Sequence, residues 1–398
     1  MPAPLEGIRV VEIANWVAAP AAGALLADLG AEVIKVEVPR GEIYRWAFPR
    51  VLGFDSDFLE APHFQMDNRG KRSLTLDLTK ADAQRALLRV IDTADVVLTN
   101  MLPQRLRKFG LDAETLRARR PALIFAEING YGSQGDEASK PAFDYAAYWA
   151  RTGFMDILHE LDAPPTFQRP GIGDHAAALA LVSGILAALR VRDRTGEGQA
   201  VEASLLHMGF YIQGNDAAIS LVAHQTPPRH DRRAPMNPLW NHYQTKDGRW
   251  IFLSMIESDP YWPRLCAALG RTDLLAREEF GDLMSRMRNS AELTAELAGV
   301  FAQRTLAEWE TQLASHPVIW APVRTLGEAI TDPQARVNGI FQSVRHPTAG
   351  EYETIAPPVK LSAHEMLGNR PAPGLGADSH DILRVAGLSD EEIAAALS

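Results

Sequence analysis

The fold is decided by residues 8–37, which read IRVVEIANWVAAPAAGALLADLGAEVIKVE. Ile8 to Ile13 is rich in β-branched residues, Ala18 to Leu29 is rich in Ala and Leu, and Glu32 to Val36 is again rich in β-branched residues. A strand, a helix and a strand joined by short connections form a βαβ unit, whose two strands run parallel. This stretch therefore predicts a parallel sheet covered by helices.

The same alternation continues along the chain. Strand patterns cover Ser73 to Leu78, Asp95 to Asn100, Ala122 to Asn129 and Gln199 to Ala203. Helical patterns lie between them, at Lys80 to Asp92, Pro103 to Phe109 and His175 to Arg192, and another follows at Leu205 to Ile219. Alternating strands and helices predict an α/β fold with a doubly wound sheet.

A change of pattern at residues 224–238 indicates a domain boundary. This stretch is polar, contains Pro and Arg, and has no regular period. Residues 239–320 then show two strand patterns, Asn241 to Gln244 and Trp250 to Met255, followed by helices, which predicts a smaller α+β domain. Strands are expected again at Phe341 to Arg345 and Tyr352 to Ile355, and a final helix at Ser389 to Leu397.

Composition and charge narrow the class of protein. The chain has 398 residues and a formal net charge of −10, whereas binders of nucleic acid or anionic lipid need a dominant positive field. Cys266 is the single cysteine, and the amino terminus lacks a basic segment followed by an apolar core. Charges interrupt the longest apolar stretches before the length of a membrane span. We therefore expect a cytoplasmic protein that binds neither nucleic acid nor membrane.

Few of the usual cofactor motifs are present. The turn after the first strand lacks the three glycines of a dinucleotide fingerprint, which disfavours a hydride-transfer enzyme. The histidines lack the spacing of metal ligands and neither HExxH nor CxxC occurs, so no metal is expected. Basic residues at 69–72 and at Arg105, Arg107 and Lys108 lie near expected strand ends, where they either hold phosphates or are solvated surface charges.

Asp174 is the carboxylate most suggestive of chemistry. Gly171 and Gly173 precede it and an almost wholly apolar helix follows. One interpretation is a helix N-cap, a position that Asp favours. The other is a reactive carboxylate, because the glycines let a substrate carbonyl approach and the helix start stabilises developing negative charge.

Several segments together resemble the class III CoA-transferase family, which includes formyl-CoA transferase, carnitine CoA-transferase and the α-methylacyl-CoA racemases. The resemblance spans essentially the whole chain and is specific in the order and spacing of its motifs. The motifs that carry it are GIRVVE at 7–12, AP at 19–20, LGAEVIKVE at 29–37, NRGKRSL at 68–74, GIGD at 171–174, GILAAL at 184–189, TGEGQ at 195–199, TKDG at 245–248 and DPQAR at 332–336.

The resemblance implies a fold and a dimer. It implies a Rossmann-like large domain built from residues 1–224 and a return segment, 326–398, with a small domain at 225–325. It also implies a homodimer in which the two subunits interlock.

The resemblance further implies a substrate and a mechanism. Coenzyme A is expected as co-substrate, moved between an acyl-CoA and a small organic acid, with Asp174 as the catalytic nucleophile. Residues expected to contact CoA are Val17, Ala18, Asn68, Lys71, Asn100, Met101 and Lys108. Residues expected to form the loops around the substrate are Gly171, Gly173, Phe143 and Asp144.

Two other classes stay open at this point. The racemase branch carries a histidine where this chain has Phe143, so the two-base proton transfer of a 2-methylacyl-CoA racemase lacks one base, which favours a transferase. A nucleotide-binding protein without catalysis is the third possibility. A transferase forms an adduct on Asp174, a racemase exchanges the α-proton of its substrate, and a pure binder does neither.

Overall fold

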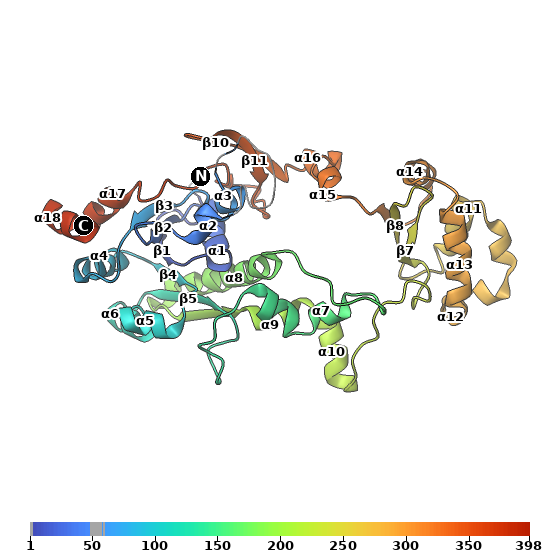
Figure 1. Cartoon of the computed structure of the whole chain (residues 1–398), viewed down its shortest axis with the longest axis horizontal. Coiled ribbons are helices and arrows are strands. Elements are labelled where there is room, and N and C mark those ends of the chain that lie inside the picture. The colour runs from blue at the N-terminus through green and yellow to red at the C-terminus, as the bar shows by residue number, and fades with distance from the viewer. Residues whose placement is uncertain (1–2, 48–57, 59) are drawn as a thin grey trace. The chain divides into compact units, whose positions relative to one another are not determined.

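The computed structural model of the chain describes residues 3–47, 58 and 60–398 (Figure 1). By its internal contacts the chain divides into two units. Unit 1 contains Met1–Met155, Phe167–Gln225 and Pro333–Ser398. Unit 2 contains Asp156–Thr166 and Thr226–Asp332.

A six-stranded parallel sheet forms the centre of unit 1. Its order is β3-β2-β1-β4-β5-β6, and every neighbouring pair is parallel. The α/β class predicted from residues 8–37 is confirmed. The strands are β1 (Arg9–Ile13), β2 (Glu32–Glu37), β3 (Arg72–Thr75), β4 (Val96–Thr99), β5 (Ile124–Asn129) and β6 (Ala200–Ser204).

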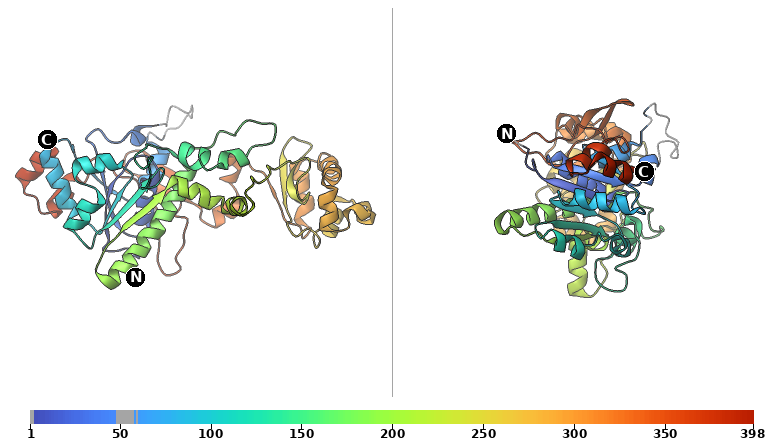
Figure 2. Two further views of the ribbon diagram at one scale, coloured as in Figure 1. Left: turned by 90° about the horizontal axis from the view of Figure 1, so that it is seen from below. Right: turned by 90° about the vertical axis from the view of Figure 1, so that its left-hand side faces the viewer.

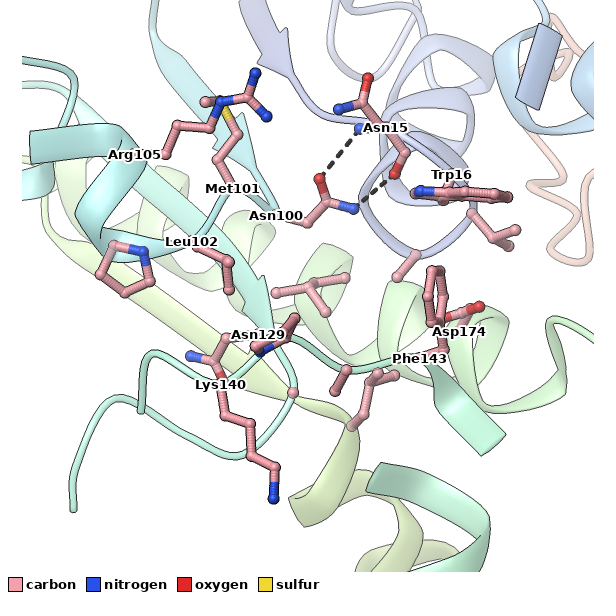
Figure 3. A pocket seen from close by; sticks show the side chains of 18 of the residues that line it. Asn15, Trp16, Asn100, Met101, Leu102, Arg105, Asn129, Lys140, Phe143 and Asp174 are labelled. Atoms are coloured by element: carbon pink, nitrogen blue, oxygen red, sulfur yellow. Dashed lines mark hydrogen bonds between the residues drawn. The ribbon is translucent and has the colours of Figure 1, made fainter. Parts of the chain in front are cut away.

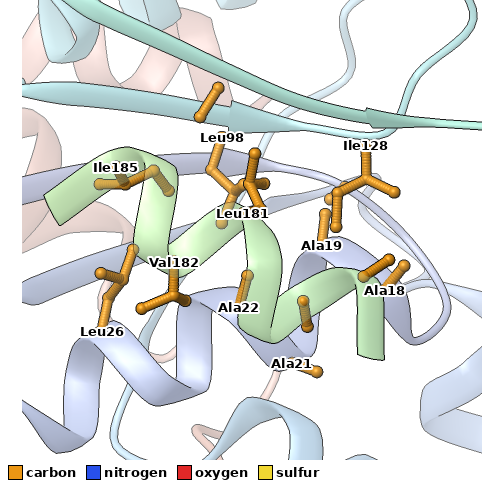
Figure 4. Packing of buried hydrophobic residues seen from close by; sticks show 14 of the residues in the cluster. Ala18, Ala19, Ala21, Ala22, Leu26, Leu98, Ile128, Leu181, Val182 and Ile185 are labelled. Carbon is orange, nitrogen blue, oxygen red and sulfur yellow. The ribbon is translucent and has the colours of Figure 1, made fainter. Parts of the chain in front are cut away.

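Both faces of this sheet are buried. Successive side chains of a strand point to opposite faces, so neighbouring residues belong to different clusters. Val10 belongs to the cluster under α1 (Ala18–Asp28) and α8 (Ile172–Thr195), and Val11 to the cluster under α4 (Ala81–Ile91). Figure 4 shows how alanines of α1 let that helix pack closely against Leu181 and Val182 of α8.

Helix α8 combines length with apolar character, and it is the one described helix that meets both criteria for a membrane span. Its contacts with α1, β5 and β6 place its buried face in the core of unit 1. The helix begins at Ile172, three residues before the expected start at His175. This difference moves Asp174 into the first helical turn.

The helix expected at Leu205 to Ile219 is two helices, α9 (Leu205–Ile212) and α10 (Gly214–Ala223). Gln213 separates them, and its side-chain amide donates to the carbonyl of Thr152 at 2.9 Å. A long-range contact therefore interrupts a continuous local pattern.

The end of the chain also packs on unit 1. Strands β10 (Phe341–His346) and β11 (Gly350–Ile355) form an antiparallel pair. Helices α17 (Ser379–Val385) and α18 (Asp390–Leu397) lie beside α4, as the right-hand view of Figure 2 shows. The Ser73 N–H of β3 donates to Asp378 at 2.9 Å, which ties this segment to the edge of the sheet.

Unit 2 has its own antiparallel sheet and its own core. Strands β7 (Trp240–Gln244), β8 (Trp250–Ser254) and β9 (Trp320–Pro322) pair in that order. Both units contain further helices. Those in the described residues are α2 (Ile43–Trp46), α3 (Pro62–Asn68), α5 (Pro103–Phe109), α6 (Ala113–Arg119), η1 (Tyr145–Ala150), α7 (Phe154–Ile157), α11 (Trp262–Leu269), η2 (Thr272–Ala276), η3 (Glu278–Phe280), α12 (Leu283–Arg288), α13 (Ser290–Phe301), α14 (Leu306–Ala314), α15 (Leu326–Ala329) and α16 (Pro333–Val337).

Candidate active site

A cavity opens in unit 1 at the carboxyl ends of β1, β4 and β5 (Figure 3). Strands β1 and β4 are neighbours at the centre of the sheet. From β1 the chain adds β2 and β3 on one side, and from β4 it adds β5 and β6 on the other. Open α/β sheets bind ligands at such a reversal of strand order. The cavity is lined by the loops after these three strands, by the loop before η1 and by the start of α8. Its lining residues are Asn15, Trp16, Val17, Ala18, Asn100, Met101, Leu102, Pro103, Arg105, Ile128, Asn129, Gly130, Ala138, Lys140, Pro141, Ala142, Phe143, Asp174 and Leu205.

Two asparagines fix the loops after β1 and β4 to each other. The Asn15 N–H donates to the side-chain oxygen of Asn100 at 3.1 Å, and the Asn100 side-chain amide donates to the Asn15 carbonyl at 2.7 Å (Figure 3). Below them, the Thr99 hydroxyl donates to the Ile13 carbonyl at 2.8 Å. One wall of the cavity is therefore held by hydrogen bonds between adjacent strand ends.

Asp174 lies in the first turn of α8, and it is not the N-cap. Gly171 is the N-cap residue, with φ at 81°, and no side chain caps this end. The capping interpretation of Asp174 is therefore wrong, because the helix starts earlier than the local pattern suggested. No hydrogen bond from the described part of the chain reaches the Asp174 carboxylate.

The helix start is packed tightly against the loop before η1. The Gly173 N–H donates to the buried carboxylate of Asp144 at 3.2 Å. A Cβ on Gly173 would lie 2.6 Å from the Tyr148 ring and 2.9 Å from the Asp144 side chain. Glycine is thus required at position 173 because no side chain fits there, and at position 171 because the backbone is left-handed.

Burial, together with the negative charges of Asp144 and Asp67, raises the pKa of Asp174 to about 7. The charge of His175 acts in the opposite direction. His175 Nε2 lies 2.9 Å from Asp67 Oδ1, and although burial opposes the charged ring, this contact raises the pKa of His175 above its usual value. The site thus holds a carboxyl group that changes charge near neutral pH.

The structure gathers part of the residues expected from the sequence. Val17, Ala18, Asn100, Met101 and Phe143 line the cavity with Asp174. Gly171, Gly173 and Asp144 surround the helix start that carries Asp174.

Three expected CoA contacts do not line this cavity. Asn68 and Lys71 are buried behind the loop after β1, where Lys71 Nζ lies 2.8 Å from the Asn68 side-chain oxygen and 2.7 Å from Glu12. Lys71 also donates to the Pro20 carbonyl at 2.8 Å, and this hydrogen bond stabilises the first turn of α1. Lys108 is exposed on α5, with its ammonium over the Phe109 ring.

Lys140 and Trp16 are among the lining residues that were not singled out from the sequence. Lys140 lies in an irregular loop. Trp16 lies in the turn after the first strand, where the sequence pattern only excluded a dinucleotide fingerprint. Arg105, which belongs to the noted basic cluster, and Lys140 both line the cavity, and the Lys140 ammonium lies 2.7 Å from Glu137 Oε1. A basic residue in a loop has no periodicity, so no sequence signal distinguished Lys140 from other surface charges.

The arrangement suits nucleophilic attack on the acyl group of a substrate that also carries negatively charged groups. A carboxylate with no hydrogen-bonding partner in the described chain is available to attack, and the guanidinium group of Arg105 can attract phosphate groups. Among the residues described, no group of three or more His, Cys, Asp or Glu side chains is placed to hold a metal ion.

Comparisons with known proteins agree over nearly the full chain. The model of CoA-transferase family III matches residues 5–379. The (R)-2-hydroxy-4-methylpentanoate CoA-transferase of Clostridioides difficile is 30% identical, covering 98% of this chain and 97% of that protein. The succinate--glutarate CoA-transferase of Agrobacterium fabrum is 31% identical, covering 96% and 95%. The crystal structure of a CAIB/BAIF family protein from Brucella suis superposes with a TM-score of 0.85 at 29% identity, covering 97% and 100%.

Proposed function

Because the chain belongs to CoA-transferase family III, as its sequence motifs predicted, we propose that it moves coenzyme A from an acyl-CoA donor to a small organic acid through intermediates on Asp174. That the protein is a CoA-transferase follows from the family and its relatives. The observation that carries the role of Asp174 is its place among the residues that line the cavity at the carboxyl ends of the strands, where its carboxylate has no hydrogen bond from the described chain.

The first half of the exchange loads CoA onto the enzyme. The Asp174 carboxylate attacks the carbonyl carbon of the donor thioester, and the C–S bond breaks to give an aspartyl-acyl anhydride and the CoA thiolate. The thiolate then attacks the aspartyl carbonyl carbon, and the anhydride C–O bond breaks. The donor acid leaves as a carboxylate, and CoA is held as an aspartyl thioester.

The second half runs the same steps in reverse with the acceptor. The acceptor carboxylate attacks the aspartyl thioester and releases the thiolate, which attacks the acceptor carbonyl carbon of the new anhydride. The acyl-CoA product forms, and Asp174 is regenerated as a carboxylate. One thioester is broken and another is formed, so the overall free-energy change of the exchange is small.

The chain's own residues supply positioning and charge. Val17, Ala18, Asn100 and Met101 form a wall against which CoA can bind, and Arg105 can pair with its phosphates. The start of α8 favours negative charge at Asp174 during each step. The family resemblance adds Asn68, Lys71 and Lys108, which stay predictions.

We extend the proposal to the assembly and its compartment. The strand order β3-β2-β1-β4-β5-β6 supports a Rossmann-like large domain. Exposed apolar side chains on α8 to α10 support a homodimer, expected to be interlocked: Leu179, Leu186, Phe210, Tyr211, Ile219, Leu221 and Val222. A single cysteine, Cys266, is compatible with the cytoplasm.

The test is CoA exchange in a panel of acyl-CoA donors and carboxylic acids, followed by mass spectrometry of the peptide that contains Asp174. Hydroxylamine should trap an adduct on Asp174 in the presence of donor. D174A and D174N should lose exchange by at least about a thousandfold, as expected for a covalent nucleophile.

D193N is the matched control, because Asp193 lies at the exposed far end of the same helix. It should retain exchange. Exchange that survives in D174N would refute the proposal. Incorporation of deuterium at the α-carbon without an acceptor acid would instead identify a racemase.

A further inference from the structure

Trp16, in the turn after β1, has an unusual backbone. Its φ is 67°, and within the described ranges only Trp16 and His224 have a left-handed backbone without being glycine. A bulky aromatic residue rarely adopts this region, and it persists only where its surroundings hold it. The contacts of Trp16 therefore reveal what holds it there.

A buried carboxylate holds the Trp16 backbone. The Trp16 N–H donates to Glu42 Oε2 at 2.6 Å. The other oxygen of Glu42 lies 2.6 Å from Lys35 Nζ, and the exposed fractions of these two side chains are 1% and 0%. Lys35 also contacts Glu12 at 3.0 Å, and Glu12 contacts Lys71 at 2.7 Å. A chain of buried charges thus ends on one backbone N–H of the cavity wall.

The Trp16 ring reaches the cavity from this fixed backbone. It lies edge-on to the Phe143 ring, with centroids 5.3 Å apart, and 6.0 Å from the Tyr44 ring. Figure 3 shows Trp16 and Phe143 next to Asp174 on the same side of the cavity. These two rings form an aromatic wall beside the carboxylate.

We propose that Glu42 is a positioning residue that holds Trp16 in its left-handed conformation, so that the aromatic wall keeps water from the intermediates on Asp174. This role rests on the proposed function of Asp174. Thioesters and anhydrides hydrolyse when water reaches them, so a transferase needs such a wall to pass CoA to an acid rather than to water. A purely structural Glu42 would only balance the charge of Lys35.

The position of Trp16 can be measured without any activity. In protein labelled with 5-fluorotryptophan, the eight tryptophans give separate fluorine resonances, and W16F identifies that of Trp16. We expect E42A to shift or broaden this resonance. E42Q, whose amide oxygen still accepts the Trp16 N–H, should move it less.

D28N is the matched control, because Asp28 forms a buried ion pair with Arg69 in the same unit without contacting Trp16. It should leave the Trp16 resonance in place. An unmoved resonance in folded E42A would overturn the proposal, whatever the role of Asp174.

The partition between transfer and hydrolysis tests the consequence. We expect E42A to raise the ratio of acyl-CoA hydrolysis to CoA transfer by about tenfold to a hundredfold, the range typical of misplaced active-site groups. W16G, which removes the ring and tolerates the positive φ, should raise the same ratio. In W16G the further change E42A should add nothing, because Glu42 acts through Trp16.

Additive effects of E42A and W16G on this ratio would overturn the proposal. If E42A does not fold, W16G carries the test, and an unchanged ratio of hydrolysis to transfer in W16G would overturn the proposal. Failure of the proposed function has a different signature, namely no adduct on Asp174 while the Trp16 resonance still responds to E42A.

Discussion

At the scale of the residue, the proposed nucleophile Asp174 occupies a position that has a cost in stability. Its carboxyl group is surrounded by the buried Asp144, by Asp67 and by aromatic rings, and the nearby His175 only partly offsets these effects. Burial raises the pKa to about 7, so ionisation is less favourable in the folded chain than in the unfolded one. In the proposed mechanism, the same surroundings leave the ionised carboxylate without a hydrogen bond from the described chain.

The first prediction concerns the stability of D174N. The folded chain holds the Asp174 proton up to about pH 7, whereas the ordinary pKa of an aspartate in an unfolded chain is 3.8, so ionisation removes stability as pH rises between these values. At pH 8 we expect D174N to exceed the wild type in free energy of unfolding by on the order of 1–4 kcal/mol. Near pH 4 the difference should disappear. Urea denaturation at both values checks this, and an equal difference at both would contradict it.

The second prediction concerns His175. Its charge lowers the pKa of Asp174, and it lies against Asp67 on α3 and the Gly171 carbonyl. H175Q removes that charge, so the acid limb of the exchange rate should move to higher pH. A pH–rate profile measures the shift. H380Q, on the exposed face of α17, should leave the limb in place. An unmoved limb in H175Q would separate His175 from the ionisation of Asp174.

At the scale of the element, the first turn of α8 is positioned by the absence of side chains. Gly171 supplies a left-handed N-cap, and Gly173 leaves room for Tyr148 and Asp144 of the neighbouring segment. The helix can therefore begin inside a packed region and present Asp174 to the cavity. Its apolar remainder anchors it on α1 and the sheet.

The third prediction compares two glycines. G173A places a methyl group 2.6 Å from the Tyr148 ring, so we expect a loss of about 1–3 kcal/mol in stability and a lower exchange rate. G299A adds a methyl group in helix α13 with nothing within 4 Å, and should stabilise the chain by about 0.5–1 kcal/mol. Thermal unfolding and exchange assays of both variants check this. Equal effects would show that crowding at Gly173 does not set the helix start.

At the scale of the whole molecule, each unit is built around its own apolar core. In unit 1 the core lies on both faces of one parallel sheet, and the site lies at one end of that sheet. The core of unit 2 is drawn entirely from residues 239–320, including the buried Trp309, whose indole N–H donates to the Phe301 carbonyl at 2.9 Å. The stability of unit 2 therefore comes from contacts within one continuous stretch.

The fourth prediction is that residues 226–332 fold when expressed alone. Their core needs no side chain from unit 1, so we expect a cooperative thermal transition by circular dichroism. W309A should abolish or sharply lower that transition, since truncation of a buried tryptophan costs about 3–5 kcal/mol. A fragment without cooperative unfolding would show that the flanking segments are needed.

Prediction from sequence succeeded where the signal was local. The strands of the parallel sheet and the β7–β8 pair follow from short periodic runs, and the observed bounds differ from the expected ones by a few residues. It failed at Gln213, where a hydrogen bond to Thr152 divides a helical pattern, and at the start of α8. Both failures involve contacts with residues far away in the sequence.

The residues of the chain alone specified the α/β class and the family and singled out Asp174 as the candidate nucleophile, because periodicity and motif spacing are properties of neighbouring positions. Folding in three dimensions determined that Asp174 stands within a helix, that Lys71 is buried against Glu12, and that Trp16 and Phe143 meet beside the carboxylate. These placements depend on packing and hydrogen bonds between distant segments, and on the burial that shifts the pKa of Asp174, which no local pattern encodes.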